Sequence, residues 1–228
     1  RRMVFCEEMM NKQNADQNFL KNILFTDEST FSLHRKHNSS IVRYGSRENK
    51  HLSIPVRTQY PQKLNVWSGI LGDYVIGPFF IEGNLNGTKY LELLQNQIVP
   101  AIQQLPNMNL GDIWYQHDGC PSHNTRAVTE YLQRTFPNRL IATNGTIKWP
   151  PRSADLSPND FFFWGFLKSK FYRHNFERAQ NLMELIAKIV QYCADITPDQ
   201  LRHTRESLYD RFTHCSYVQG GLFEPLLH

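Results

Sequence analysis

Three aspartates stand in contexts that suit a single metal site. Asp27 and Asp118 each follow a short apolar run of the kind that forms a buried strand, and Asp160 opens an aromatic segment. Carboxylates at two strand ends and on a nearby helix are the ligands that hard divalent cations require. Two such ions about 3.5–4 Å apart can clamp a phosphoryl group during an in-line displacement. The pattern therefore predicts chemistry that cuts or joins nucleic-acid strands.

Each aspartate also has a rival or a purely structural explanation. Neighbouring strand residues point to opposite faces, so only one of Asp27 and Glu28 can face the site, and we choose Asp27 because it is nearer the apolar strand. Asp160 stands three residues after Ser157, where a carboxylate would complete a helix capping box. Asp155, in the loop just before it, is the alternative ligand, and the residue types alone do not separate the two.

The residues after Asp118 include more potential functional groups than a simple turn needs. Gly119 would let a phosphate or a metal approach the backbone closely. His123 could bind phosphate or hydrogen-bond a ligand carboxylate, although a solvent-facing residue at a helix start is an equally good interpretation. A zinc site built from His117, Cys120 and His123 lacks a fourth ligand, and its spacing fits no standard finger.

Composition and charge set wider limits. The chain has 228 residues and is 40% hydrophobic, enough for a packed core, and we expect one large domain over residues 1–228. Its four scattered cysteines indicate free thiols and a reducing compartment. No apolar stretch is long enough to span a membrane, and the first residues show no signal peptide. Position 1 is not methionine, so we expect a piece of a longer product.

The net charge of +4 is only mildly basic and does not by itself indicate DNA binding, since lysine and arginine also serve solubility. Their local distribution is more informative. Lys148 and Arg152 flank a proline pair just before Asp160, and three further basic residues follow it, namely Lys168, Lys170 and Arg173. This arrangement would steer phosphates toward the acidic site.

Periodicity and turn signals predict alternating strands and helices. We expect short strands at 22–25, 31–33, 41–44, 113–116 and 140–142, and a hairpin of 64–70 with 74–81 around Gly72 and Asp73. We expect helices at 88–105 (interrupted by Pro100), 125–136, 157–172 and 182–193, another from Thr197 in a capping-box pattern, and a lead-in helix or linker within residues 1–20. This order predicts a mixed α/β sheet covered by helices.

Four segments together resemble the catalytic domain of a Tc1/mariner-type DNA transposase. They are ILFTDESTF (23–31), NVWSGI with VIGPFF (65–70 and 75–80), HDGCPSH (117–123) and WPPRSADLSPND (149–160). The first, second and third acids of that family match Asp27, Asp118 and Asp160, and the third acid is aspartate in mariner-like members and glutamate in Tc1-like ones. By this resemblance Asp160, rather than Asp155, is the ligand.

The resemblance carries expectations about fold, chemistry and partners. It implies an RNase H-like fold, a mixed five-stranded sheet with helices on both faces, and two Mg²⁺ or Mn²⁺ ions held by the three acids. It implies metal-dependent cleavage at the ends of a DNA element, strand transfer into target DNA at TA, a homodimer in a synaptic complex, and a nuclear location. Segment 34–49 falls where family members contact the element end or the partner subunit. As nucleic-acid contacts we expect His123, Lys148, Arg152, Arg35 and Lys36.

The chain also departs from the family pattern. Asp118 and Asp160 are separated by 41 residues, more than in the best-known mariner branch, and Ala154 stands where proline is usual. We expect the N-terminal helix-turn-helix domains of the family to be absent. A catalytically inert, domesticated DNA-binding or dimerisation module therefore remains an alternative. A nuclease acting on RNA–DNA hybrids would use the same acids and is the third hypothesis.

Overall fold

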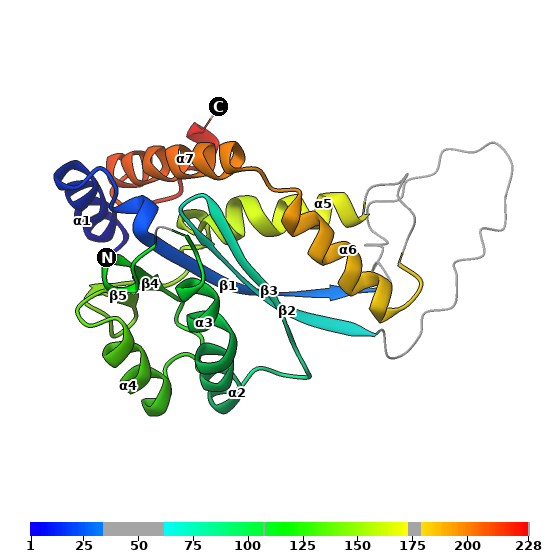
Figure 1. Ribbon diagram of the computed structural model, residues 1–228. Coiled ribbons are helices and arrows are strands. Elements are labelled where there is room, and N and C mark those ends of the chain that lie inside the picture. The colour runs from blue at the N-terminus through cyan, green and yellow to red at the C-terminus, as the bar shows by residue number, and fades with distance from the viewer. Residues whose placement is uncertain (34–61, 107, 173–178, 228) are drawn as a thin grey trace, which may run out of the picture.

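The computed structural model describes residues 1–33, 62–106, 108–172 and 179–227. Its centre is a six-stranded sheet in the order β3-β2-β1-β4-β5-β6. The β3-β2-β1 half is antiparallel, and the β1-β4-β5-β6 half is parallel. Helices cover both faces of this sheet (Figure 1), as expected for a mixed α/β protein.

The longest strand, β1, runs from Ile23 to Ser32. The sequence predicted two short strands here, at 22–25 and 31–33, with Asp27 just after the first, and this expectation is wrong. The alternation continues through the polar residues because β1 is paired with β2 along its whole length, from Leu24 opposite Leu71 to Ser32 opposite Lys63. The continuous antiparallel ladder satisfies backbone groups that a turn would have left exposed.

The antiparallel half matches the predicted hairpin. Strand β2 (Lys63–Leu71) and strand β3 (Tyr74–Ile81) are joined by a tight turn at Gly72 and Asp73. Gly72 has a φ of +58°, in the left-handed region that glycine enters without steric cost. The strand expected at 41–44 lies outside the described residues.

The parallel half consists of short strands connected through helix α4 and a turn. It contains β4 (Trp114–Gln116), β5 (Leu140–Ala142) and β6 (Ile147–Lys148). The sequence predicted β4 and β5 but not β6, so the sheet has six strands instead of the expected five. Two residues next to a Trp-Pro-Pro sequence carry too little periodicity to indicate a strand; β6 forms because Ile147 pairs with Ile141.

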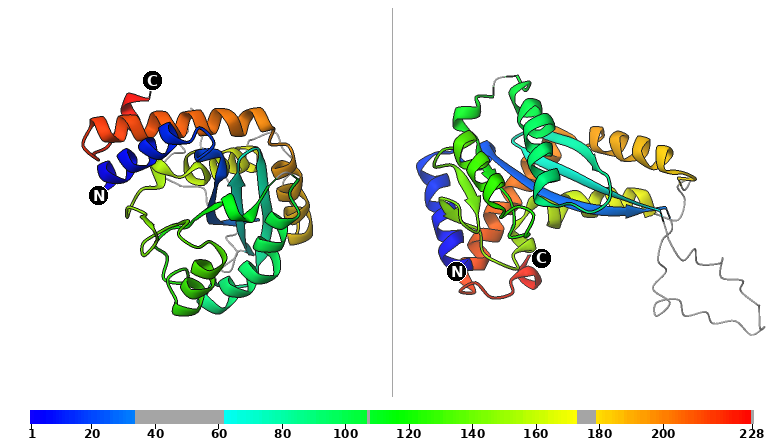
Figure 2. Two further views of the ribbon diagram at one scale, coloured as in Figure 1. Left: turned by 60° about the vertical axis from the view of Figure 1, so that its left-hand side comes forward. Right: turned by 90° about the horizontal axis from the view of Figure 1, so that it is seen from below.

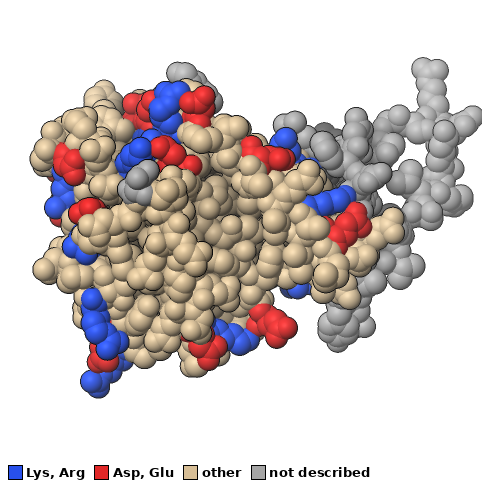
Figure 3. All heavy atoms as spheres, in the orientation of Figure 1, with Lys and Arg blue, Asp and Glu red and all other residues tan. Residues whose placement is uncertain are grey.

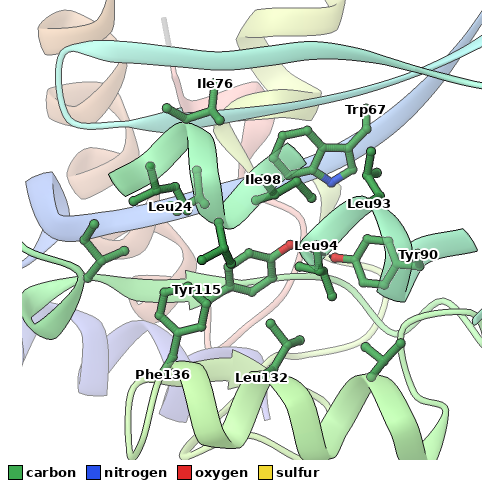
Figure 4. Close-up of a cluster of buried hydrophobic side chains, with 14 of the residues drawn as sticks. Leu24, Trp67, Ile76, Tyr90, Leu93, Leu94, Ile98, Tyr115, Leu132 and Phe136 are labelled. Atoms are coloured by element: carbon green, nitrogen blue, oxygen red, sulfur yellow. Dashed lines mark hydrogen bonds between the residues drawn. The ribbon is translucent and has the colours of Figure 1, made fainter. Parts of the chain in front are cut away.

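One face of the sheet is covered by α2 (Gly87–Leu93), α3 (Val99–Gln103) and α4 (Arg126–Thr135). A π-helical turn, Leu94–Ile98, joins α2 to α3, so the interruption expected near Pro100 is present. These helices bury a cluster around Trp67, Tyr90 and Tyr115 against the sheet (Figure 4). The two tyrosine hydroxyl groups are 2.8 Å apart, so one donates a hydrogen bond to the other inside the apolar layer.

The opposite face is covered by α1 (Arg2–Ala15), α5 (Trp164–Tyr172), α6 (Leu182–Ala194) and α7 (Pro198–Tyr217). Helices α1 and α7 lie side by side (Figures 1 and 2). Helix α7 begins as predicted, with Thr197 and Gln200 forming a reciprocal capping box. Two apolar clusters, one under α1 and α7 and one under α5 and α6, fix these helices on the sheet.

The surface shows no large region of one charge on the side drawn in Figure 3. Lysine and arginine side chains are interspersed there with aspartate and glutamate. This mixture agrees with the mild net charge of +4. Among the described residues, none of the helices has the length and apolar character that crossing a bilayer would demand. The four cysteines are free thiols.

Candidate metal site

The first two aspartates come from neighbouring parallel strands. In the ladder between β1 and β4, Phe25 is opposite Gln116, and Asp27 and Asp118 each lie two residues further along. Strand β4 ends at this point, and the Thr26 hydroxyl donates to the Gln116 carbonyl at 2.8 Å, closing the end of the ladder. Adjacent strands are about 4.8 Å apart, so the shared register places the two aspartates at the same level, where β4 ends and β1 continues.

The third aspartate reaches this end from a helix. Asp160 lies in a π-helical turn, Asn159–Phe163, that leads directly into α5. The helix begins at Pro158, where the sequence predicted its start. Asn159 is buried, and its amide donates to the Ser68 carbonyl at 2.9 Å. Because Ser68 is the cross-strand partner of Asp27, this bond fixes the turn that carries Asp160 beside β1.

Among the described residues, no cation forms an ion pair with the Asp27 carboxylate, and its charged neighbours are other carboxylates. Burial and the charges of Asp160 and Glu28 together raise its pKa to about 7. The indole Nε1 of Trp164 donates to Asp27 Oδ2 at 2.7 Å, which opposes the rise without cancelling it. Burial and the charge of Asp118 likewise raise the pKa of Asp160, although Ser157 and Lys168 act against that rise. The three aspartates therefore lie within electrostatic reach of one another.

Asp118 has the opposite environment. His123 Nδ1 is 2.8 Å from Asp118 Oδ1, and His123 Nε2 is 3.2 Å from Glu28 Oε1. Burial alone would lower the pKa of His123, but these two carboxylates outweigh it and raise that pKa to about 10. The imidazolium and the Cys120 backbone N–H, which donates at 3.0 Å, in turn hold the pKa of Asp118 below its usual value. Asp118 is thus paired with a buried cation.

The neighbours of His123 are neutral and aromatic. Its ring centroid is 4.2 Å from that of Tyr90 and 5.1 Å from that of His117. Burial and the charge of His123 together lower the pKa of His117 to about 3, so His117 is uncharged. Both nitrogens of His123 face carboxylates, so it cannot serve as a zinc ligand with His117 and Cys120.

Asp155, the rival of Asp160, is used elsewhere. Both of its carboxylate oxygens accept from the guanidinium of Arg2, at 2.7 and 2.5 Å. Arg2 also donates to the Ser153 hydroxyl and to the Arg152 carbonyl, and Arg211 donates to the Asp155 carbonyl. This bidentate geometry is the strongest form of carboxylate pairing. It ties the loop before Asp160 to α1 and occupies the acceptor capacity that a metal would need.

The predicted nucleic-acid contacts are distributed unevenly. Lys148, on β6, and Arg152, after the proline pair, are exposed at the surface. His123 is only 1% exposed and engaged on both nitrogens, so a direct phosphate contact through it does not fit the structure. The other interpretation, a hydrogen bond to a ligand carboxylate, agrees with its position. Arg35 and Lys36 lie outside the described residues.

The donor set fits a hard cation that takes few of its ligands from the protein. In the part of the chain that the structure describes, no three His, Cys, Asp or Glu side chains form a ready-made cage for an ion. Mg²⁺ does not need such a cage, because it takes one or two carboxylates and fills its other positions with water and phosphate oxygens. A cation beside Asp27 and Asp160 would also offset the burial and the carboxylate repulsion that raise both of their pKa values.

Sequence reasoning missed two residues of this site. Trp164 stands four positions after Asp160, about one helical turn, and it is the single indole in a run of phenylalanines, which is a signal that could have been used. Asn159 has no such signal, because its contact with Ser68 depends on how α5 packs on β2.

Comparisons with known proteins give one consistent result. No protein-family model matches the chain, and no curated protein matches it in sequence. Among solved structures, the Mos1 transposase paired-end complex with the left transposon end has a TM-score of 0.79 at 19% identity, covering 98% of this chain and 62% of the Mos1 chain. The Mos1 strand transfer complex has a TM-score of 0.78 at 19% identity, with the same two coverages.

The isolated catalytic domain gives a match over nearly its full length. The Mos1 transposase catalytic domain with raltegravir and Mn has a TM-score of 0.75 at 18% identity, covering 98% of this chain and 95% of that one. The chain thus spans about 62% of the Mos1 chain in the DNA complexes and nearly all of its catalytic domain. These likenesses confirm the expected fold: the chain has the RNase H-like fold of the Mos1 mariner transposase catalytic domain.

Proposed function

We propose that this chain is the catalytic domain of a DNA transposase that cleaves DNA strands and joins them to a target. The observation that supports the proposal is the placement of Asp27, Asp118 and Asp160 within electrostatic reach of one another beside the end of β4, in a fold shared with the Mos1 catalytic domain over 98% of this chain. Under this proposal, the acids from β1, the segment after β4 and the turn before α5 would together form the phosphoryl-transfer site.

The proposed cofactors are divalent ions, Mg²⁺ or Mn²⁺, and the structures of the Mos1 catalytic domain include both metals. Asp27 and Asp160 supply the uncompensated negative charge that would hold them, and Asp118 supplies an oriented carboxylate whose other contacts are already satisfied. Bound there, such ions would lower the pKa of the attacking water or 3′-hydroxyl and stabilise the leaving oxygen.

The proposed substrate is double-stranded DNA at the ends of a transposable element, with TA as the target. The Mos1 paired-end complex with the left transposon end and the Mos1 strand transfer complex support this assignment. Exposed Lys148 and Arg152 border the loop that leads to Asp160 and are proposed phosphate contacts. A homodimer acting in the nucleus completes the proposal.

Metal-dependent nicking of duplex DNA tests the proposal directly. The protein is incubated with supercoiled plasmid in Mg²⁺, Mn²⁺ or EDTA, with Asp160→Asn as the matched control. Nicking by the wild type in metal, with loss in EDTA and in the variant, supports it. Cleavage of RNA–DNA hybrid but not of duplex DNA would assign the nuclease function instead. Calorimetry that detects no Mn²⁺ binding would favour the inert module.

A further inference from the structure

The indole of Trp164 contacts the candidate ligand Asp27 directly. Its Nε1–H donates to Asp27 Oδ2 at 2.7 Å, a short bond to a charged acceptor. Trp164 is the first residue of α5, the helix entered through the turn that carries Asp160. One helix therefore supplies both the third carboxylate and the donor that contacts the first one.

The indole has little freedom to move. Trp164 is 4% exposed, and its ring packs edge-on against Phe163 and Phe31, with centroid distances of 4.8 and 6.2 Å. Phe31 lies on β1, four residues beyond Asp27 and on the same face of the strand. The strand that carries the carboxylate thus also holds the ring that donates to it, so the donor is fixed relative to Asp27.

The chemical nature of the donor matters as much as its position. An indole N–H donates a single hydrogen bond, accepts none and carries no charge. It can orient a carboxylate without neutralising it, whereas a guanidinium in the same place would form an ion pair that competes with a metal, as Arg2 does for Asp155. The indole therefore leaves Asp27 without an ion-pair partner that would compete with a metal.

We propose that Trp164 is a positioning residue of the metal site, whose indole N–H fixes the Asp27 carboxylate in the orientation that binds a divalent ion. This inference rests on the proposed function. Hydrogen-bonding partners of metal ligands typically contribute about 10–100-fold to metal affinity or activity. Loss of the indole N–H is therefore expected to appear first as weaker metal binding.

The test compares Trp164→Phe with Trp67→Phe. Both variants replace a buried indole with a smaller phenyl ring. Trp67 Nε1 has no hydrogen-bond partner within the described part of the chain, so Trp67→Phe removes packing alone. Mn²⁺ binding is measured by calorimetry, thermal unfolding is measured in EDTA, and plasmid nicking is measured as a function of Mn²⁺ concentration.

For Trp164→Phe we expect a Mn²⁺ dissociation constant and a half-saturating Mn²⁺ concentration raised about 10–100-fold, with nicking at saturating Mn²⁺ within a few-fold of the wild type. Trp67→Phe should lower the melting temperature with unchanged Mn²⁺ affinity. Equal Mn²⁺ affinity in Trp164→Phe and the wild type, or an equal loss in both variants, would overturn the positioning role alone. Absence of Mn²⁺ binding by the wild type would overturn the metal site, and this role with it.

Discussion

Asp27 and Asp118 each lie two residues beyond the last residue pair that joins β1 to β4, yet their surroundings differ in charge. Burial and repulsion by Asp160 and Glu28 raise the pKa of Asp27 to about 7, and its hydrogen bond from the neutral indole only partly opposes that rise. Asp118 lies against the buried His123 cation, and its pKa falls. The same register along the sheet therefore produces one carboxylate with excess negative charge and one that is already balanced.

This difference separates two tasks within one site. Because Asp118 is held by His123 and by the Cys120 backbone N–H, its carboxylate is oriented before any ion arrives. The side of Asp27 and Asp160 stores electrostatic repulsion that only a cation or a proton can relieve. Attraction for metal is therefore concentrated on Asp27 and Asp160, and rigidity on Asp118.

Removing either carboxylate should produce the largest effect. Asp27→Asn and Asp118→Asn should each lower metal-dependent nicking by more than about 100-fold, since even indirect partners of ligands contribute about 10–100-fold. Their free energies of unfolding at pH 8 in EDTA should change in opposite directions. Asp27→Asn removes repulsion and stabilises the fold, whereas Asp118→Asn deprives the His123 cation of one partner and destabilises it.

Urea unfolding of the two variants beside the wild type measures both signs. Plasmid nicking under identical metal concentrations measures the activity. A stability change of the same sign in both variants would contradict the electrostatic difference between the strands, whatever the nicking result.

Replacing the buried cation should be the largest change in stability. His123→Asn leaves Asp118 and Glu28 close together without the positive charge between them. Breaking a fully buried ion pair costs about 3–5 kcal/mol, and because the Asp118 side chain is half exposed we expect about 2–3 kcal/mol here. Urea unfolding at pH 7 gives the value. His117→Asn, which removes an uncharged ring from the same stack, is the control and should cost clearly less.

The dependence of stability on pH should distinguish Asp27 from His123, the cation that pairs with Asp118. The folded pKa of Asp27, about 7, lies above the usual value of 3.8, so the native state retains a proton that the unfolded chain has lost. Stability in EDTA should therefore fall by roughly 1–3 kcal/mol as pH rises from 4 to 7. For His123 the folded pKa of about 10 exceeds 6.5, so its contribution is complete below pH 6.5 and is lost as pH rises through 10.

Single variants assign each pH window. Asp27→Asn should flatten the profile between pH 4 and 7 and leave the alkaline slope, and His123→Asn should do the reverse. Chemical unfolding at a series of pH values provides the profiles. An unchanged acidic slope in Asp27→Asn would show that another group binds the proton.

The smallest effect should come from the bond that anchors Asp160 beside Asp27. Asn159→Ala removes the donor to the Ser68 carbonyl, and it also removes a buried Oδ1 atom that has no partner within the described residues. Loss of the hydrogen bond destabilises the fold, and removal of the unpaired Oδ1 stabilises it. The two effects partly cancel, so we expect a net destabilisation of about 1 kcal/mol. Thermal unfolding measures it, and Ser169→Ala, which removes a partly buried local bond in α5, serves as a control.

The parts of the fold that depend on local chemistry could be predicted from sequence. The side chains of Thr197 and Gln200 mark a helix start. Gly72 marks a turn because glycine enters the left-handed φ region without steric cost. The continuity of β1 through Asp27 and the formation of β6 could not be predicted, because both depend on pairing with a partner strand that lies elsewhere in the chain. The local sequence pattern does not indicate which distant strand a segment will pair with.

The same limit applies to the candidate site. Residue types and resemblance were enough to choose the three aspartates. The sequence could not show that Arg2 engages Asp155 or that His123 lies between Asp118 and Glu28, because these contacts join residues far apart in the chain. Charge balance at a buried site is a property of the assembled elements, so it becomes visible only in three dimensions.

The π-helical turn Asn159–Phe163 makes this segment more sensitive to a change in length than to a substitution. Each residue of an ordinary α-helix advances it by about 100°, and a π-helical turn contains one residue more than an α-helical one. Deleting one residue between Asp160 and Trp164 would restore regular winding and rotate α5 relative to Asp160. The indole and the third carboxylate could then no longer face β1 together, so this segment should tolerate substitution far better than a change in length.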